Sequence, residues 1–162
     1  MTFPLPARTL LRKGQWTGPV AALLTLSYDA RLLRRKRLET SAGGLMVDLA
    51  ETTSLDHGDA LQTDDGRLIE IAAADEPVVQ VYGDLPRLAW HIGNRHTPCQ
   101  IGPTHLTIRR DHVLEAMLAQ LGADLTPVIA PFCPEGGAYG HGRTFGHDHG
   151  PNGFPALAHA LE

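Results

Sequence analysis

The 162-residue chain contains only two cysteines, Cys99 and Cys133, and no long apolar run. Two thiols build neither a disulfide framework nor a four-cysteine zinc site, and we expect both to be reduced. The longest largely apolar run, VAALLTL at 20–26, is far shorter than the roughly 20 residues needed to span a bilayer. The first residues lack a signal peptide's order of charge, apolar stretch and cleavage site. These absences predict a cytoplasmic protein that does not enter membranes.

Catalytic motifs are also missing. The sequence has no G-x-S-x-G elbow, phosphate-binding loop or dinucleotide fingerprint, and neither cysteine lies in a recognisable activating motif. A metal hydrolase typically needs three ligands on rigid elements and an open position for water. Here most candidate ligands lie in a glycine-rich segment, so we expect a protein that is not an enzyme. A small metal-dependent hydrolase is the least favoured alternative.

The charge balance argues against nucleic-acid binding, because the formal net charge is -4 and phosphate recognition requires a basic face. One local exception is RLLRRKR at 31–37. A solvated strand whose charges resist edge pairing would explain this run, and so would a docking patch for an acidic protein partner. Both interpretations remain open from the sequence.

Residues 1–73 are predicted to form a small all-β domain. Gly43-Gly44 and Asp65-Gly66 each stand between two extended runs, as hairpin turns that require positive φ do. A further turn, LDHGDAL at 55–61, contains His57, which we expect to be an exposed loop residue rather than a ligand.

Residues 74–134 show a different periodicity and are predicted to form a second domain. A strand at 77–83 precedes a helix that runs from Leu85 towards His91, capped by Asp84 and stopped at Gly93-Asn94. Short strands follow at 99–102 and 105–110, then a helix from Asp111 to about Leu121. The last strand, at 125–132, contains two prolines and is therefore placed at a sheet edge. This order is the ferredoxin-like βαββαβ arrangement, so the predicted fold class is α+β.

Residues 135–162 are rich in glycine, and we expect them to form a mobile tail. Of the chain's nine histidines, four lie in this tail. In an extended segment His147 and His149 project to the same side and can reach one ion, with His141 available as a third ligand. Imidazole suits nickel, zinc and copper, so the tail is a candidate metal-binding segment.

The stretch HIGNRHTPCQIG at 91–102 holds further candidate ligands. On one continuous helix His91 and His96 would point about 140° apart, but a stop at Gly93-Asn94 would leave His96 accessible beyond the helix end. A structural or merely exposed histidine is the competing interpretation. Cys99 follows His96 at a spacing that could chelate, or it packs as a small apolar residue.

HIGNRHTP resembles the signature of the UreE urease accessory proteins, a family of nickel metallochaperones. The resemblance extends to LDHGDAL, IEIAAADEPVVQV, DHVLEAMLAQLG and PFCPEGGAYGHG. It implies a homodimer with a β domain that contacts partners or peptides and a ferredoxin-like metal domain. His96 matches the family histidine that binds nickel at the dimer axis, one from each subunit. His141, His147 and His149 would complete that site or relay ions to it.

The resemblance also implies the partners, namely the urease apoprotein and other urease accessory proteins, including the GTPase. His112 matches a histidine of a secondary site in some members, but Arg110 replaces its usual partner, so we do not expect that site here. The residues alone do not distinguish nickel from zinc or copper, since nitrogen ligands bind all three. Two functions therefore follow as hypotheses: a nickel carrier, and an adaptor that docks urease maturation proteins without transferring metal.

Overall fold

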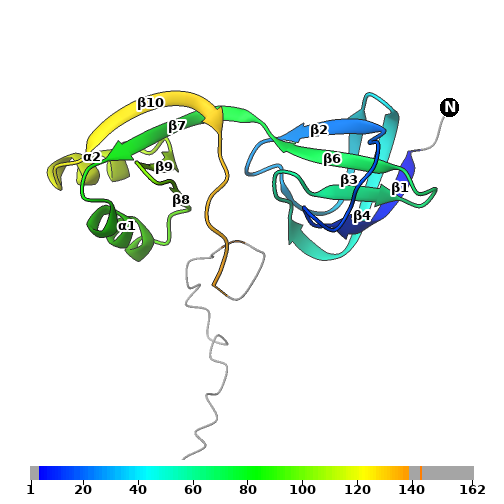
Figure 1. Cartoon of the computed structure of the whole chain (residues 1–162), viewed down its shortest axis with the longest axis horizontal. Helices are drawn as coiled ribbons and strands as arrows, with labels where there is room; N and C mark the ends of the chain where they lie inside the picture. The colour runs from blue at the N-terminus through cyan, green and yellow to red at the C-terminus, as the bar shows by residue number, and fades with distance from the viewer. Residues whose placement is uncertain (1–3, 139–142, 144–162) are drawn as a thin grey trace, which may run out of the picture.

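The computed structural model describes residues 4–138 and 143. The described part of the chain is mostly sheet with two helices, which confirms the α+β class. Strands β1 to β6 form one sheet, and β7 to β10 form a second sheet on which both helices pack (Figure 1). The expected mobile tail, with His141, His147 and His149, lies outside the described residues except for its first residues and Arg143. No helix in the described ranges is long and apolar enough to cross a bilayer.

The first sheet has the strand order β2-β6-β5-β1-β4-β3. Its strands are β1 Leu5–Leu11, β2 Ala22–Leu26, β3 Leu32–Thr40, β4 Gly43–Ser54, β5 Ala60–Thr63 and β6 Leu68–Ala73. Alternate residues point inward, as a half-buried sheet requires. The inward side chains make one core, which includes Ala7, Leu24, Leu33, Leu45, Val47, Leu61, Ile69 and Ile71.

Both predicted hairpins are present. The β5–β6 turn contains Asp65-Gly66, where Gly66 has a φ of +88° and its N–H donates to the Thr63 carbonyl at 2.9 Å. The β3–β4 turn is shifted from the expected position, because residues 41–42 form the turn and Gly43 is already the first residue of β4. The prediction of a two-residue turn is correct. The pairing of Thr40 with Gly43 places this turn at residues 41–42 instead of 43–44.

The basic run at 31–37 divides between two environments. The four residues Arg34, Arg35, Lys36 and Arg37 are exposed on β3, an edge strand of the sheet. Arg31 is instead 2% exposed. It lies before β3 in the connection from β2, where the chain turns towards the second sheet. Its charge is therefore unavailable to a surface partner.

The second sheet has the order β10-β7-β9-β8, with every neighbouring pair antiparallel. Its elements are β7 Asp75–Tyr82, α1 Leu85–Asn94, β8 Gln100–Ile101, β9 Leu106–Arg109, α2 His112–Gln120 and β10 Asp124–Pro131. The order strand, helix, strand, strand, helix, strand is the one expected, and β10 lies at an edge as its prolines predict. The helices bury Leu88, Ile92, Leu114 and Leu118 against Val79, Val81, Leu106 and Ile108.

Aspartate caps begin both helices at the predicted residues. The Asp84 carboxylate accepts the Arg87 backbone N–H at 3.4 Å. Oδ1 of Asp111 accepts the N–H groups of Val113 and Leu114 at 2.9 and 3.0 Å. These bonds hold the pKa of Asp111 below its usual value, chiefly the bond from Leu114, because they favour the charged carboxylate.

A third apolar cluster joins the two sheets. Tyr28 from the β2–β3 connection packs edge-on against Phe132, with ring centroids 5.3 Å apart, and Val78 of β7 completes the cluster. The Tyr28 backbone N–H donates to Oε2 of Glu76 at 2.9 Å. Arg31 donates to the carbonyls of Leu26 and Phe132. The C-terminal segment leaves β10 at this junction (Figure 1), so residues from both sheets surround its start.

Candidate metal centre

His96 lies just beyond α1, in the capping turn of that helix. The helix ends at Asn94, within the predicted stop at Gly93-Asn94, but the residue with left-handed geometry is His96. The His96 N–H donates to the Gly93 carbonyl at 2.9 Å, and the Thr97 N–H donates to the Ile92 carbonyl at 3.4 Å. This pair of bonds is the Schellman motif, in which the residue at the His96 position adopts a left-handed conformation and is usually glycine.

His96 is the one non-glycine residue with positive φ in the described ranges, at φ 55°. Histidine visits this region more readily than most side chains, yet the left-handed conformation costs an L-residue about 1–2 kcal/mol. Strained residues of this kind concentrate at functional sites. The side chain is exposed, as expected for a ligand beyond the helix end.

His91 and Cys99 occupy different surroundings from His96. His91 is in the last turn of α1, half-buried, with its ring edge-on to Trp90 at 5.0 Å. Cys99 packs against the helix-covered core. Burial, with a smaller contribution from Glu135, raises the pKa of the Cys99 thiol to about 11. The thiolate that binds metal is therefore scarce near neutral pH, which favours packing over chelation for Cys99.

The loop after His96 is hydrogen-bonded to the start of the C-terminal segment. The Glu135 N–H donates to the Cys99 carbonyl at 2.9 Å. The Cys133 N–H donates to Oε1 of Gln100 at 2.9 Å. Two segments more than thirty residues apart in sequence are thereby held together. The tail histidines predicted as ligands consequently belong to a segment that begins beside the His96 loop.

His112 and Arg110 lie at the start of α2. His112 is exposed at the first helical position. Arg110 pairs with Glu115, with 3.1 Å between Nη2 and Oε1, so its side chain stabilises the helix start. In the described ranges, no group of three or more histidine, cysteine, aspartate or glutamate residues is placed to hold a metal ion.

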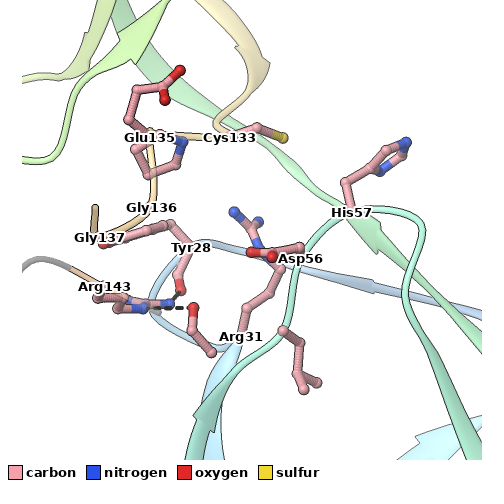
Figure 2. A pocket seen from close by; sticks show the side chains of 12 residues that line it. Tyr28, Arg31, Asp56, His57, Cys133, Glu135, Gly136, Gly137 and Arg143 are labelled. Carbon is pink, nitrogen blue, oxygen red and sulfur yellow. Dashed lines mark hydrogen bonds between the residues drawn. The ribbon is translucent and has the colours of Figure 1, made fainter. Parts of the chain in front are cut away.

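A pocket of about 420 Å³ lies at the junction of the sheets. Arg31, Tyr28, Asp56 and His57 line it from the first sheet, and residues 133–137 with Arg143 line it from the C-terminal segment (Figure 2). His57 is exposed as predicted, and its Nδ1 accepts the Ala73 N–H at 3.1 Å. Nε of Arg31 has no hydrogen-bond partner among the described residues. Sequence reasoning missed this pocket because its residues are far apart along the chain.

The chain matches two family models over most of its length. The N-terminal domain of the UreE urease accessory protein matches residues 5–74, and the C-terminal domain of the UreE urease accessory protein matches residues 68–159. The C-terminal match includes His96 and the tail histidines, although a match by itself assigns no role to any of them.

Several proteins named urease accessory protein UreE are close relatives. The one from Cereibacter sphaeroides is 66% identical over 152 residues, which cover 93% of this chain and 84% of the relative. The one from Ruegeria pomeroyi is 62% identical over 148 residues, with 90% and 99% covered. That from Rhodobacter capsulatus is 57% identical over 146 residues, with 90% and 93% covered. With two family models over most of its length and relatives of this identity, this chain belongs to the UreE urease accessory protein family.

Proposed function

We propose that the chain is a cytoplasmic nickel metallochaperone that acts as a homodimer. Each subunit contributes His96 to one Ni(II) ion at the dimer interface, and the chain delivers this ion during assembly of the urease active site. Nickel is the cargo, and zinc or copper bind the same nitrogen ligands. The observation that carries the proposal is the exposed His96, held in a left-handed turn that favours glycine.

A metal site shared between two subunits fits a histidine that has no further metal ligand close by in sequence, because two-fold symmetry supplies the same side chain twice. The tail supplies further ligands in this proposal. His141 follows Glu135 by six residues, a length of chain that spans at most about 20 Å. Because the Glu135 backbone is hydrogen-bonded to the Cys99 carbonyl, this length allows His141 to approach the His96 loop. His147 and His149, farther along the chain, have a longer reach.

The proposed role of each domain follows the resemblance to the family. We propose an all-β domain at 1–73 for partner or peptide contact, a ferredoxin-like metal domain at 74–134 and a metal-binding tail at 135–162. The strand order β10-β7-β9-β8, with both helices packed on that sheet, supports the ferredoxin-like assignment. The proposed partners are the urease apoprotein and other urease accessory proteins, including the GTPase.

Nickel binding by equilibrium dialysis, together with mass by light scattering, tests this proposal. The variants are His96→Ala, the double variant His147→Ala/His149→Ala, and His112→Ala as a matched control with an exposed histidine outside the proposed site. We expect a dimer whose tight nickel binding is lost in His96→Ala, weakened in the tail variant and retained in His112→Ala. Tight binding in His96→Ala would overturn the assignment of His96.

A second candidate function is docking of maturation proteins without metal transfer. The specific observation is the exposed edge strand β3, where Arg34, Arg35 and Lys36 form no ion pair with any described residue. Reversal of charge in Arg34→Glu/Lys36→Glu should then abolish partner binding in a pull-down while nickel binding stays intact. Arg87→Glu, on an exposed residue of α1, is the control. Unchanged pull-down by the double variant would exclude this role for β3.

A further inference from the structure

Arg143 makes contacts that set it apart from a surface arginine. Its guanidinium carbon lies 3.6 Å from the centroid of the Tyr28 ring. Nε donates to Oγ of Ser54 at 3.1 Å, and Nη2 donates to the Tyr28 carbonyl (Figure 2). The planar guanidinium thus stacks its face on an aromatic ring and donates hydrogen bonds from its edge to two acceptors. Arginine makes this combination of contacts and lysine does not.

The receiving site is built from buried groups. Tyr28 is 6% exposed and Ser54 is 9% exposed. Tyr28 is fixed by Phe132 against its ring and by Glu76, which accepts from its backbone N–H. Because these contacts do not involve Arg143, the ring face and the carbonyl are already in place when the arginine arrives. Preorganised acceptors of this kind reduce the entropic cost of binding.

Charges of both signs surround the Tyr28 ring. The guanidinium carbons of Arg31 and Arg109 lie 5.7 and 4.7 Å from the same ring centroid. Of the acidic groups nearby, Asp29 pairs with Arg109 at 2.9 Å. Burial is the main cause that lowers the pKa of Arg143; Arg31 and Arg109 lower it further, whereas Tyr28 and Asp29 raise it. Arg143 lies beside two other guanidinium groups, and its stacking and hydrogen bonds offset their repulsion.

We infer that Arg143 anchors the C-terminal segment in a guanidinium site formed by Tyr28 and Ser54. The segment is then fixed at two places, at Glu135 by the Cys99 carbonyl and at Arg143 by the Tyr28 site. His141 lies between these fixed points and only two residues before the anchor. The anchor limits the volume that His141 searches, which raises its effective concentration near the start of the segment.

Trypsin tests the anchor in the metal-free, full-length protein, because the protease must take the Arg143 side chain into its own pocket. Cleavage after Arg143 is followed by mass spectrometry of fragment 144–162 and compared with a peptide of residues 138–150, in which Arg143 is the sole trypsin site. We expect cleavage at least about tenfold slower in the protein than in the peptide, since proteolysis tracks the released population. Equal rates would overturn the inference.

Two variants make the test specific. Arg143→Lys keeps the charge and the trypsin site but loses the fork geometry, so the protein should be cut about fivefold faster than wild type, although the same change in the peptide brings no such gain. Ser54→Ala should act similarly. Thr52→Ala, which removes an exposed hydroxyl on the same strand, is the control and should leave cleavage unchanged. If neither Arg143→Lys nor Ser54→Ala speeds cleavage, Arg143 is not held by this site.

The consequence for nickel rests on the proposed function and needs a separate readout. Arg143→Gln should release bound nickel to a competing chelator several-fold faster than wild type, because His141 then searches a larger volume. Arg87→Gln is the matched charge-loss control. Because trypsin cleavage is measured without metal, failure to bind nickel would leave the anchor result intact. An unchanged release rate in a nickel-binding protein would overturn the role of the anchor in holding His141.

Discussion

Replacement of His96 by glycine should separate the backbone role of this residue from its proposed role as a ligand. In the Schellman turn His96 has a φ of 55°, which costs a residue with a Cβ about 1–2 kcal/mol. Glycine removes that cost but gives back about 0.4–1 kcal/mol through its greater freedom in the unfolded chain. His96→Gly should therefore be more stable than His96→Ala by about 0.5–1 kcal/mol.

Both variants lack the imidazole, so the difference between their stabilities contains no contribution from contacts of the His96 ring. Thermal unfolding should be followed in the presence of a chelator and at a fixed protein concentration, since metal and association both shift the midpoint. A difference of this size corresponds to a few degrees in Tm for a chain of this length.

A glycine substitution that should lower the stability serves as the control. Ala116 is exposed in the middle of α2, where Ala116→Gly should lower stability by about 1 kcal/mol. A His96→Gly variant less stable than His96→Ala would show that the left-handed conformation at residue 96 is not strained. Neither His96 variant should bind nickel tightly, although His96→Gly should be the more stable of the two.

Three further predictions concern the pH dependence of nickel binding, the packing of Phe132 at the junction and the reactivity of the Cys99 thiol. Nickel affinity should fall as pH drops through about 6.5, the ordinary histidine pKa, because protonated imidazole does not bind metal; a binding constant independent of pH between about 5 and 8 would contradict this. Phe132→Ala should cost about 3–5 kcal/mol in urea unfolding, because Phe132 is 0% exposed and packs on Tyr28; a loss under about 1 kcal/mol would show that the cavity collapses. Alkylation of Cys99 should be slow at neutral pH and accelerate up to its pKa of about 11; fast labelling at neutral pH would refute its burial.

Much of the local structure was predictable because its causes are local. Asp84 and Asp111 cap the two helices as predicted, and the glycine at position 66 marks its hairpin. The prolines of β10 placed that strand at a sheet edge, since a residue without an N–H cannot serve a central strand. The predicted stop of α1 at Gly93-Asn94 agrees with the observed last residue, Asn94, but the left-handed residue is His96, because the tolerance of Gly93 and Asn94 for left-handed geometry does not oblige them to adopt it.

Local residues suffice to predict the caps, the periodicity, the order of elements and the exposure of His96 beyond a helix, because each depends on residues within one or two turns of chain. Tertiary packing instead decided that Arg31 leaves the exposed basic run and is buried at the junction. It also decided that Tyr28 meets Phe132 and that Arg143 reaches Tyr28 and Ser54. These contacts join residues about ninety or more positions apart, and no local propensity encodes such a pairing; it follows from the tertiary contacts at the junction.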